Sequence, residues 1–349
     1  MKTKSILILV FCFALLALPQ AQAKHKVTKF DVPGAGTGPG QGTSSGGIVD
    51  DGFIVGWYYD SNGVAHGFLR SPANKFTKFD PTGSVGTFTP GMNSAHAMAG
   101  YFFDSNGVYH GFWRSTKGKI TTYNAPGAGT ASGQGTIFED INNNGETAGY
   151  YLDSNGVLHG FVRTAAGKYT EFDAPGVGTG KGQGTAEAGF DGLTDKGAIA
   201  VQGIDSNNVY HGYLRTPGGK FTEFDPTGSV NTGVSGINVK NSIVGQYYDS
   251  AGGLHGFVRK ANGTITPVNY PNSTATSISN INSSGTSTGA YADSTGLLHG
   301  FVLSPGGKFT GFSVPGASGG TLPASNNDPG AVTGSWVDSN GVFHGFVWQ

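Results

Sequence analysis

The chain has 349 residues, of which 61 are glycine, and only 12% of the residues are charged, which leaves a formal net charge of −1 at pH 7. So small a charge argues against nucleic acid or an anionic membrane surface as the partner. The aromatic content of 12% argues against a disordered chain, and the lack of a glycine at every third position excludes collagen.

A signal peptide is predicted over residues 1–23. Lysines at the start are followed by an apolar run at 6–18, too short to span a bilayer, and by the small-residue cleavage site Ala21-Gln22-Ala23. Cleavage near Ala23 predicts a secreted protein, periplasmic or extracellular, with no membrane span. The single cysteine, Cys12, lies in this segment, so residues 24–349 are expected to form one domain without disulfides.

A repeating unit fills residues 24–349. Each copy contains a His-Gly-aromatic triplet, and an aspartate stands six residues before its histidine. The histidines, separated by 44 to 52 residues, are His66, His110, His159, His211, His255, His299 and His344. Units of this length are typical of β-propeller blades, each of which has four strands.

Four strands are predicted in each unit, in the order that the first copy illustrates. Alternating apolar residues at 54–60 lead through a Ser-Asn-Gly turn to a strand at 64–70, and a second turn leads to a strand at 75–80. A glycine-rich connection then precedes the strand that ends near 92–93. This connection is the longest and the most variable, so we place the crossover between units there.

The crossovers differ in length. From the strand ending in Phe-Asp to the Ile-Asn strand, the step is 12 residues in three cases, 17 before the first and third units, and 20 before the fourth. We therefore predict that longer crossovers enter the first, third and fourth units. They would make the face that carries the crossovers asymmetric.

The two ends of the chain are complementary. The chain finishes on a His strand, 343–349, with no Lys-Phe-Thr strand after it, and it begins after the cleavage site with an isolated strand of that type at 26–31. We predict an all-β, seven-bladed β-propeller in which the N-terminal strand closes the last blade. An open β-solenoid is the alternative, but it does not require complementary ends.

The unit resembles the repeats of bacterial extracellular proteins named for a His-Ala-Phe triplet. The resemblance covers residues 26–349 through Gly-x-aromatic-x-Asp and His-Gly-Phe, with Tyr213 once in place of Phe and glycine in place of alanine in every copy. The resemblance implies export and a repeat fold. It does not imply a catalytic role for any residue of this chain.

The recurring polar residues receive structural interpretations. Asp-Ser-Asn-Gly resembles the start of a calcium loop, but no bidentate acid follows at the twelfth position. A type I turn is favoured, because Asn208 replaces the glycine at the position that requires a positive φ. The seven histidines are interpreted as tethers within their own units rather than as a metal or catalytic site. No metal and no cofactor is predicted.

An aromatic residue stands two positions before most of the recurring aspartates. We expect these side chains to pack neighbouring blades together, with stacked sugar platforms as the alternative. They are Tyr58, Phe102, Tyr151, Tyr247, Tyr291 and Trp336.

Residues that break the repeat are the better functional candidates. Three crossovers share an 11-residue string, at 33–43, 126–136 and 175–185, and no predicted helix follows it, which argues against a phosphate-binding loop. Unrepeated acids, able in principle to act as general acid and base on a glycoside or uronide, lie near two of these strings. We predict that any ligand binds on the crossover face nearest the third and fourth units, through Gln134, Glu139, Asp140, Gln183, Glu187 and Asp191.

The predicted function is that of an exported, monomeric, non-catalytic module that binds carbohydrate or another envelope or environmental polymer. One alternative is a polysaccharide lyase or glycoside hydrolase with acids at the central funnel, and another is a structural or adhesive surface repeat protein. Convergence of Glu139, Asp140, Glu187 and Asp191 at one mouth of the channel would favour an enzyme, and their separation would favour a binding module.

Overall fold

The computed structural model describes residues 25–187 and 191–349, so the predicted signal peptide lies outside the described residues. The regular structure of the described residues is β-strand, which confirms the predicted all-β class. These residues include no helix with the length and apolar character needed to cross a membrane.

The strands follow one another in units of four along the chain. The first unit has β2 (Gly42–Ile48), β3 (Ile54–Tyr59), β4 (Ala65–Arg70) and β5 (Phe76–Phe79). The second has β6 (Gly86–Met92), β7 (Met98–Phe103), β8 (Tyr109–Arg114) and β9 (Ile120–Tyr123). The third has β10 (Gly135–Ile141), β11 (Thr147–Leu152), β12 (Leu158–Arg163) and β13 (Tyr169–Phe172). The fourth has β14 (Gly184–Glu187), β15 (Ile199–Ile204), β16 (Tyr210–Arg215) and β17 (Phe221–Phe224).

The remaining units continue this pattern to the end of the chain. The fifth has β18 (Ser229–Ile237), β19 (Ile243–Asp249), β20 (Leu254–Arg259) and β21 (Ile265–Val268). The sixth has β22 (Ala275–Ile281), β23 (Ser287–Ala292), β24 (Leu298–Leu303) and β25 (Phe309–Phe312). The last has β26 (Gly320–Asn326), β27 (Val332–Val337) and β28 (Phe343–Trp348), and β1 (Val27–Phe30) pairs with β28.

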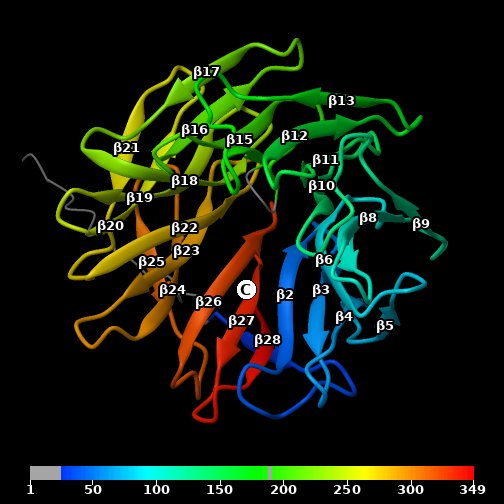
Figure 1. The fold of residues 1–349 in the computed structure, drawn as a ribbon. Coiled ribbons are helices and arrows are strands. Elements are labelled where there is room, and N and C mark those ends of the chain that lie inside the picture. Colours follow the sequence, from blue (N-terminus) through cyan, green and yellow to red (C-terminus); the bar gives the residue numbers. More distant parts are fainter. Residues whose placement is uncertain (1–24, 188–190) are drawn as a thin grey trace, which may run out of the picture.

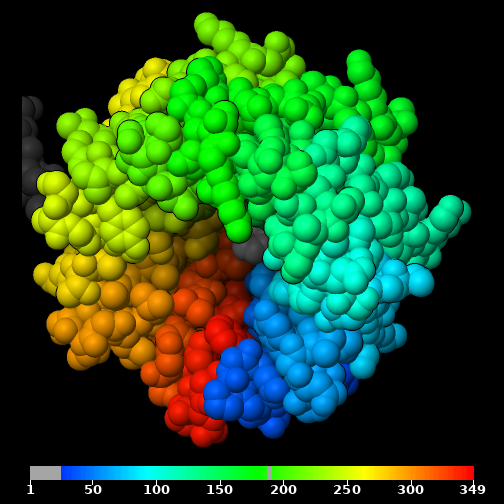
Figure 2. All heavy atoms as spheres, viewed as in Figure 1, coloured from blue at the N-terminus to red at the C-terminus, as the bar shows by residue number. Residues whose placement is uncertain are grey.

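Each unit is an antiparallel sheet whose strands pair in chain order, as in β2-β3-β4-β5. The units are arranged around a common centre, with their first strands innermost (Figure 1). In the space-filling view the molecule is hollowed at that centre (Figure 2). The inner ends of the units therefore surround the part of the molecule where side chains from many units meet.

The N-terminal strand lies beside the C-terminal strand. β1 is antiparallel to β28, with Val27 opposite Trp348 and Phe30 opposite Gly345. It thus occupies the outer position in the last unit that β5 occupies in the first. Phe30 is buried against Phe68 of the first unit, so β1 also contacts the neighbouring unit.

The core lies between neighbouring units rather than inside any one of them. The aromatic residue of each His-Gly-aromatic triplet is at most 2% exposed, and it packs against apolar residues of an adjacent unit. Each arginine that follows a triplet lies over an aromatic ring of the preceding unit. The pairs are Arg70–Phe30, Arg114–Phe79, Arg163–Tyr123, Arg215–Phe172 and Arg259–Phe224, at 3.7 to 4.8 Å from the ring centroid. These contacts join each unit to its neighbour by apolar and cation–π packing.

A glycine begins the first strand after each of the three long crossovers. Gly135 has a φ of 119°, and a Cβ there would lie 2.1 Å from the backbone oxygen of Tyr109 in the preceding unit. Gly42 and Gly184 have the same conformation and the same close approach. No side chain fits at these positions, which explains why the Gly-Gln-Gly-Thr end of the crossover string recurs unchanged.

The prediction of an especially long crossover into the fourth unit was wrong. The inner strands of the first, third and fourth units begin at Gly42, Gly135 and Gly184, equally far after the preceding Phe-Asp or Tyr-Asn pair. The fourth unit is longer because its inner segment from Gly184 to Leu193 has three more residues than Gly135 to Ile141. In the sequence, the three additional residues therefore belong to the segment between Gly184 and Leu193 and not to the crossover.

Candidate functional site

The recurring histidines act as tethers, as predicted. In every unit the His Nδ1 atom lies 2.7 to 3.1 Å from a side-chain oxygen. In the first six units the partner stands fourteen positions later, as Asp80 does for His66. In the last unit the partner of His344 is Asp31 in the N-terminal segment. Nε2 lies 3.0 to 3.9 Å from the aspartate six residues earlier. These contacts place the histidines in separate units rather than at one common site. His211, Glu223 and Asp225 lie close enough to share a cation, but they belong to one such tether.

The Asp-Ser-Asn-Gly segments are turns, as predicted. Asp60 Oδ1 accepts hydrogen bonds from the backbone N–H groups of Asn62 and Val64, at 2.8 and 2.9 Å, and the other units repeat this arrangement. Asn208 has a φ of 63°, in the left-handed region where the other units have glycine. The backbone bond from Val64 is the largest cause of the lowered pKa of Asp60. The carboxylates therefore serve the turn itself.

The predicted packing role of the aromatic residues before the aspartates is also confirmed. Five of the six are at most 8% exposed, and Tyr291 is half-buried. Each ring lies 4.3 to 5.2 Å from the imidazole ring of its own unit. Tyr151, Tyr247 and Trp336 also lie in apolar clusters with residues of the preceding unit, which favours packing between units over stacking on a sugar.

Gln134 and Gln183 hold the crossover loops together. Gln134 Oε1 accepts a hydrogen bond from the Ala131 N–H at 3.0 Å, and its Nε2 donates to the Ser154 oxygen at 2.9 Å. Gln183 makes the equivalent bonds to Gly180 and Ser206. Gln41 does the same in the first unit. The glutamines of the shared string therefore have structural partners at the crossover face.

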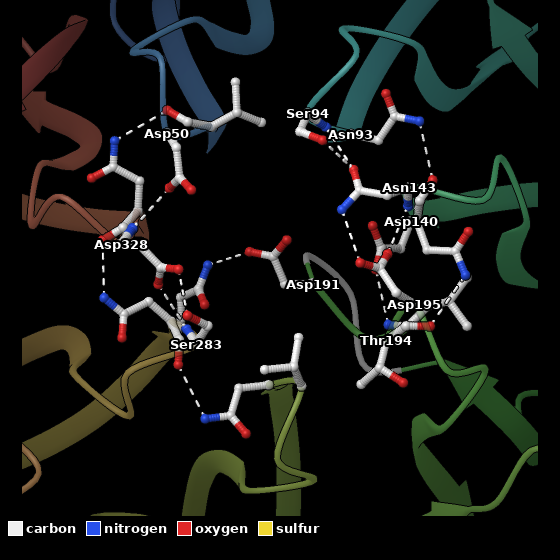
Figure 3. Close-up of a pocket in the computed structure, with 18 of the residues that line it drawn as sticks. Asp50, Asn93, Ser94, Asp140, Asn143, Asp191, Thr194, Asp195, Ser283 and Asp328 are labelled. Carbon is white, nitrogen blue, oxygen red and sulfur yellow. Dashed lines mark hydrogen bonds between the residues drawn. The ribbon is translucent and has the colours of Figure 1, made fainter.

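The acids lie at the opposite end of the inner strands. Asp140 and Asp191 line an open depression of about 220 Å³ that is bordered by the turns following the first strands. We call this depression the hairpin mouth. Since crossovers enter at the start of each first strand and these turns follow its end, the prediction that the six candidate residues share one face was wrong. In Figure 3, Asp191 projects into the middle of this mouth, with Asp140 and Asp195 on one side and Asp50 and Asp328 on the other.

Asp140 is positioned by a β-bulge. The pairing of β10 with β11 shifts between Phe138 and Asp140, so Glu139 is the extra residue. Asp140 is 4% exposed, and its Oδ1 and Oδ2 accept the backbone N–H groups of Ile141 at 2.6 Å and of Leu193 at 2.9 Å. Burial is the main cause of the raised pKa of Asp140, and the nearby charge of Asp191 adds to it.

Asp191 connects the fourth unit to units across the mouth. Its Oδ2 accepts hydrogen bonds from Asn280 Nδ2 in the sixth unit and from Ser325 Oγ, 3.5 Å away, in the last. Its backbone oxygen accepts the Ile237 N–H of the fifth unit at 2.9 Å. Asp191 as a residue is exposed, but the partial withdrawal of its carboxylate from water raises its pKa. Asp191 therefore links the fourth unit to the fifth, the sixth and the last units.

The two predicted glutamates, Glu139 and Glu187, lie near the ends of the inner strands β10 and β14. Glu139 is half-buried, and burial raises its pKa to about 7; its charge contributes to the raised pKa of Tyr101. Glu187 pairs with Val201 at the end of β14, and its side chain lies outside the described part of the structure. Of the four predicted acids, Asp140 and Asp191 therefore converge, with the charge of Glu139 close enough to act on Asp140.

A belt of asparagines around the hairpin mouth was missed from the sequence. The Nδ2 group of each donates at 2.9 to 3.1 Å to the backbone oxygen of the corresponding residue in the next unit. The members are Asn93, Asn142, Asn238, Asn282 and Asn327. The recurring Ile-Asn dipeptide was the signal that pointed to it. Asn327 bonds to Val49, so the belt also joins the last unit to the first.

A second cavity lies along the same inner strands, and we call it the channel cavity. It has a volume of about 490 Å³, and its described lining residues carry no charged side chain. Hydroxyl and amide side chains line it, from Ser44, Ser45, Ser235, Gln246, Ser277, Ser279 and Ser335. Trp57 is also part of the lining, and it belongs to a group of half-buried rings with Phe88, 5.7 Å away, and Tyr101. Apolar side chains, among them Val234, Leu322 and Phe343, form the larger part of the lining, so the channel cavity is an uncharged, mainly apolar surface with hydroxyl and amide groups and an aromatic ring set into it.

No protein-family model matches the sequence, and no similar curated protein was found. Several solved structures have a similar fold. Virginiamycin B lyase from Staphylococcus aureus is 16% identical with a TM-score of 0.60, and the match covers 93% of this chain and 100% of that one. The BP39L lectin from Burkholderia pseudomallei is 15% identical with a TM-score of 0.57, covering 88% of this chain and 96% of that one. The fold is therefore of the β-propeller class, which these comparisons show to include both a lyase and a lectin.

Proposed function

We propose that the protein is an exported, seven-bladed β-propeller that binds a neutral carbohydrate in its channel cavity without altering it. The observation that carries this proposal is the lining of that cavity: hydroxyl and amide groups from several units beside the ring of Trp57, with no charged side chain among the described lining residues. Sugars present hydroxyl groups at their edges and apolar C–H groups on their faces. Hydrogen-bonding side chains and an aromatic surface match both.

Ser45 adds to this argument. It is 4% exposed and lines the channel cavity, and its Oγ has no hydrogen-bond partner among the described residues. At the corresponding place in the third and sixth units stand Phe138 and Ile278, both fully buried. The first unit therefore has a buried hydroxyl without a described partner beside the channel cavity, where two other units have a packed apolar side chain.

The seven-blade arrangement is supported by contacts between the two ends of the chain. β1 completes the last unit, and Arg70 of the first unit lies 4.5 Å from the Phe30 ring. The Asp328 N–H also donates to Asp50 Oδ1 at 2.9 Å. Export rests on the pattern of residues 1–23 and on the resemblance to extracellular His-Ala-Phe repeat proteins.

Carbohydrate binding is tested with a glycan array, followed by titration of the best ligand. We expect Trp57→Ala to weaken binding at least about tenfold and Gln246→Ala to weaken it less, because a stacked ring buries more ligand surface than one amide contacts. Tyr248→Ala is the matched control, since Tyr248 is 47% exposed and does not line the channel cavity. The proposal is overturned if Tyr248→Ala abolishes binding while Trp57→Ala and Gln246→Ala bind as the wild type does. That result would indicate a site on the crossover face.

A second candidate function, lyase or glycosidase activity, is favoured by the convergence of Asp140 and Asp191 at the hairpin mouth. The hydrogen bonds that both carboxylates already accept argue against it, because a general acid or base must be free to exchange a proton with substrate. The test is a depolymerisation screen on polysaccharides. Release of reducing ends or unsaturated products that disappears in both Asp140→Asn and Asp191→Asn would establish an enzyme, and no release would leave binding as the function.

A further inference from the structure

The channel cavity lies against some units and not others. Its described lining residues come from the first, fifth, sixth and last units. On their inner strands the second and third units carry Phe88 and Ile137. At the same place the fifth and sixth units have Gly233 and Ser277. Small residues in the fifth and sixth units therefore leave space beside the inner strands that larger side chains take up in the second and third.

Gly233 makes room for the amide group of Gln246. The two residues are paired across β18 and β19, and a Cβ at Gly233 would lie 3.0 Å from Gln246 Nε2. Gln246 lines the channel cavity, and its Oε1 accepts a hydrogen bond from Ser235 Oγ at 3.0 Å. Its Nε2 has no hydrogen-bond partner among the described residues. The amide thus uses its acceptor within the protein and leaves its donors for a ligand.

Most of the remaining lining is apolar. Leu322, Pro323 and Ala324 form one stretch of it in β26, and Phe343 at the start of β28 adds to it. A sugar hydroxyl placed against such side chains loses its hydrogen bonds to water without replacement. The carboxylate of an acidic sugar would be less stable still, because neither lysine nor arginine is among the described lining residues. The lining therefore favours a neutral sugar that carries an apolar substituent.

We propose that the channel cavity selects N-acetylated amino sugars, an inference that rests on the proposed function of this cavity as a carbohydrate site. An acetamido group combines an acceptor oxygen with a methyl group. Its oxygen accepts a hydrogen bond from Gln246 Nε2, its methyl group packs against the apolar lining, and the sugar ring stacks on Trp57. A volume of about 490 Å³ lies within the range of sites for drug-sized ligands, so it accommodates a short oligosaccharide.

The test compares ligands that differ only at the acetamido group, by calorimetric titration of the protein lacking residues 1–23. Triacetylchitotriose is paired with cellotriose, which has hydroxyl groups in place of the acetamido groups, and N-acetylgalactosamine is paired with galactose. In at least one pair we expect the acetamido ligand to bind at least about tenfold more tightly than its partner, because it adds a hydrogen bond and a buried methyl group.

Variants of two glutamines locate the preference. Gln246→Ala should weaken binding of the acetamido ligand about fivefold, and Gln246→Glu, which replaces the donors by an acceptor, about tenfold. Gln202→Ala is the matched control, because Gln202 occupies the corresponding place in the fourth unit, opposite Ala186, and is not among the described lining residues. It should keep the affinity within about twofold. Melting temperatures of the three variants show whether each remains folded.

The outcomes separate this inference from the proposed function. If Trp57→Ala abolishes glycan binding but the hydroxyl ligand of both pairs binds as tightly as its acetamido partner, the inference is overturned and the proposed function stands. The same follows if a glycan array shows binding only to glycans without an acetamido group, including deoxy sugars that carry a methyl group. The inference is also overturned if both folded Gln246 variants bind the acetamido ligand as the wild type does. If no glycan binds, the proposed function fails and this inference fails with it.

Discussion

The crossover loops and the hairpin mouth use their polar side chains in opposite ways. Gln41, Gln134 and Gln183 recur at equivalent places in three crossovers, and each makes the same pair of hydrogen bonds. At the hairpin mouth, Asp140 and Asp191 each occur in one unit alone, and their carboxylates accept hydrogen bonds from other units. The residues that recur thus stabilise each copy of the loop, whereas the acids that occur once connect different units.

The largest loss of stability is expected at the junction of the chain ends. There β1 makes, in the last unit, the contacts that the fourth strand makes in the other units. Deleting residues 24–31 removes the buried Phe30 and the His344–Asp31 contact and exposes the edge of β28. We expect the free energy of unfolding to fall by more than about 4 kcal/mol, or the protein to aggregate. Thermal melting and size-exclusion chromatography measure both, with a protein lacking only residues 1–23 as the control. A monomer with an unchanged melting temperature would show that β1 does not close the last blade.

A smaller loss is expected at the start of an inner strand. Gly135→Ala places a Cβ against the Tyr109 backbone oxygen at a φ of 119°, and we expect it to cost about 3 kcal/mol or more. Gly133→Ala is the control, because Gly133 also has a positive φ, 77°, but no atom within 4 Å of the added Cβ; it should cost about 1 kcal/mol. Equal losses in urea unfolding of the two variants would mean that the close approach between units is unimportant.

The two regions can be compared directly by removing one amide from each. Asn282 is 7% exposed, and its side chain bonds to the Thr286 N–H and to the Asn327 oxygen, whereas Gln134 makes its two bonds at the exposed crossover. We expect Asn282→Ala to cost about 2 to 3 kcal/mol and Gln134→Ala about 1 kcal/mol, because partners left without hydrogen bonds cost more when buried. Chemical denaturation measures both, and the reverse order would contradict the belt as the stronger link.

The smallest effect concerns the pH dependence of a tether. Hydrogen bonding to Asn269 and to Asp249 raises the pKa of His255 above its usual 6.5, so its stabilising contribution is complete below pH 6.5 and is lost as the pH rises through the folded-state value. The bond from His255 lowers the pKa of Asp249, whose contribution is therefore lost as the pH falls below 3.8 toward its folded-state value. We expect the melting-temperature difference between wild type and His255→Gln to shrink between pH 5.5 and 8.5. A difference that stays constant over this range would exclude a charged tether.

The sequence by itself determined the local structure of this protein. Alternation of apolar residues identified the four strands of each unit, and the Asp-x-Asn-Gly pattern identified turns whose hydrogen bonds span only two to four residues, as at Asp60. The fourteen-residue spacing within a unit likewise suffices for a histidine such as His66 to meet its partner in the adjacent strand. These features depend on residues close together in the chain, so local geometry decides them.

The tertiary structure alone decided where the site lies. Asp140 and Asp191 come from two different units, and Asp191 meets Asn280 of a third across 89 positions of sequence. Whether such residues meet depends on which end of each inner strand they occupy and on where an insertion is accommodated. In the fourth unit, the additional residues belong to the segment between Gly184 and Leu193, and the Asp191 carboxylate lies in the hairpin mouth. The shared string that ends at Thr43, Thr136 and Thr185 shows in the sequence that the extra residues follow the crossover, but only the packing of the inner strands around the centre brings Asp191 to Asn280 and Ser325.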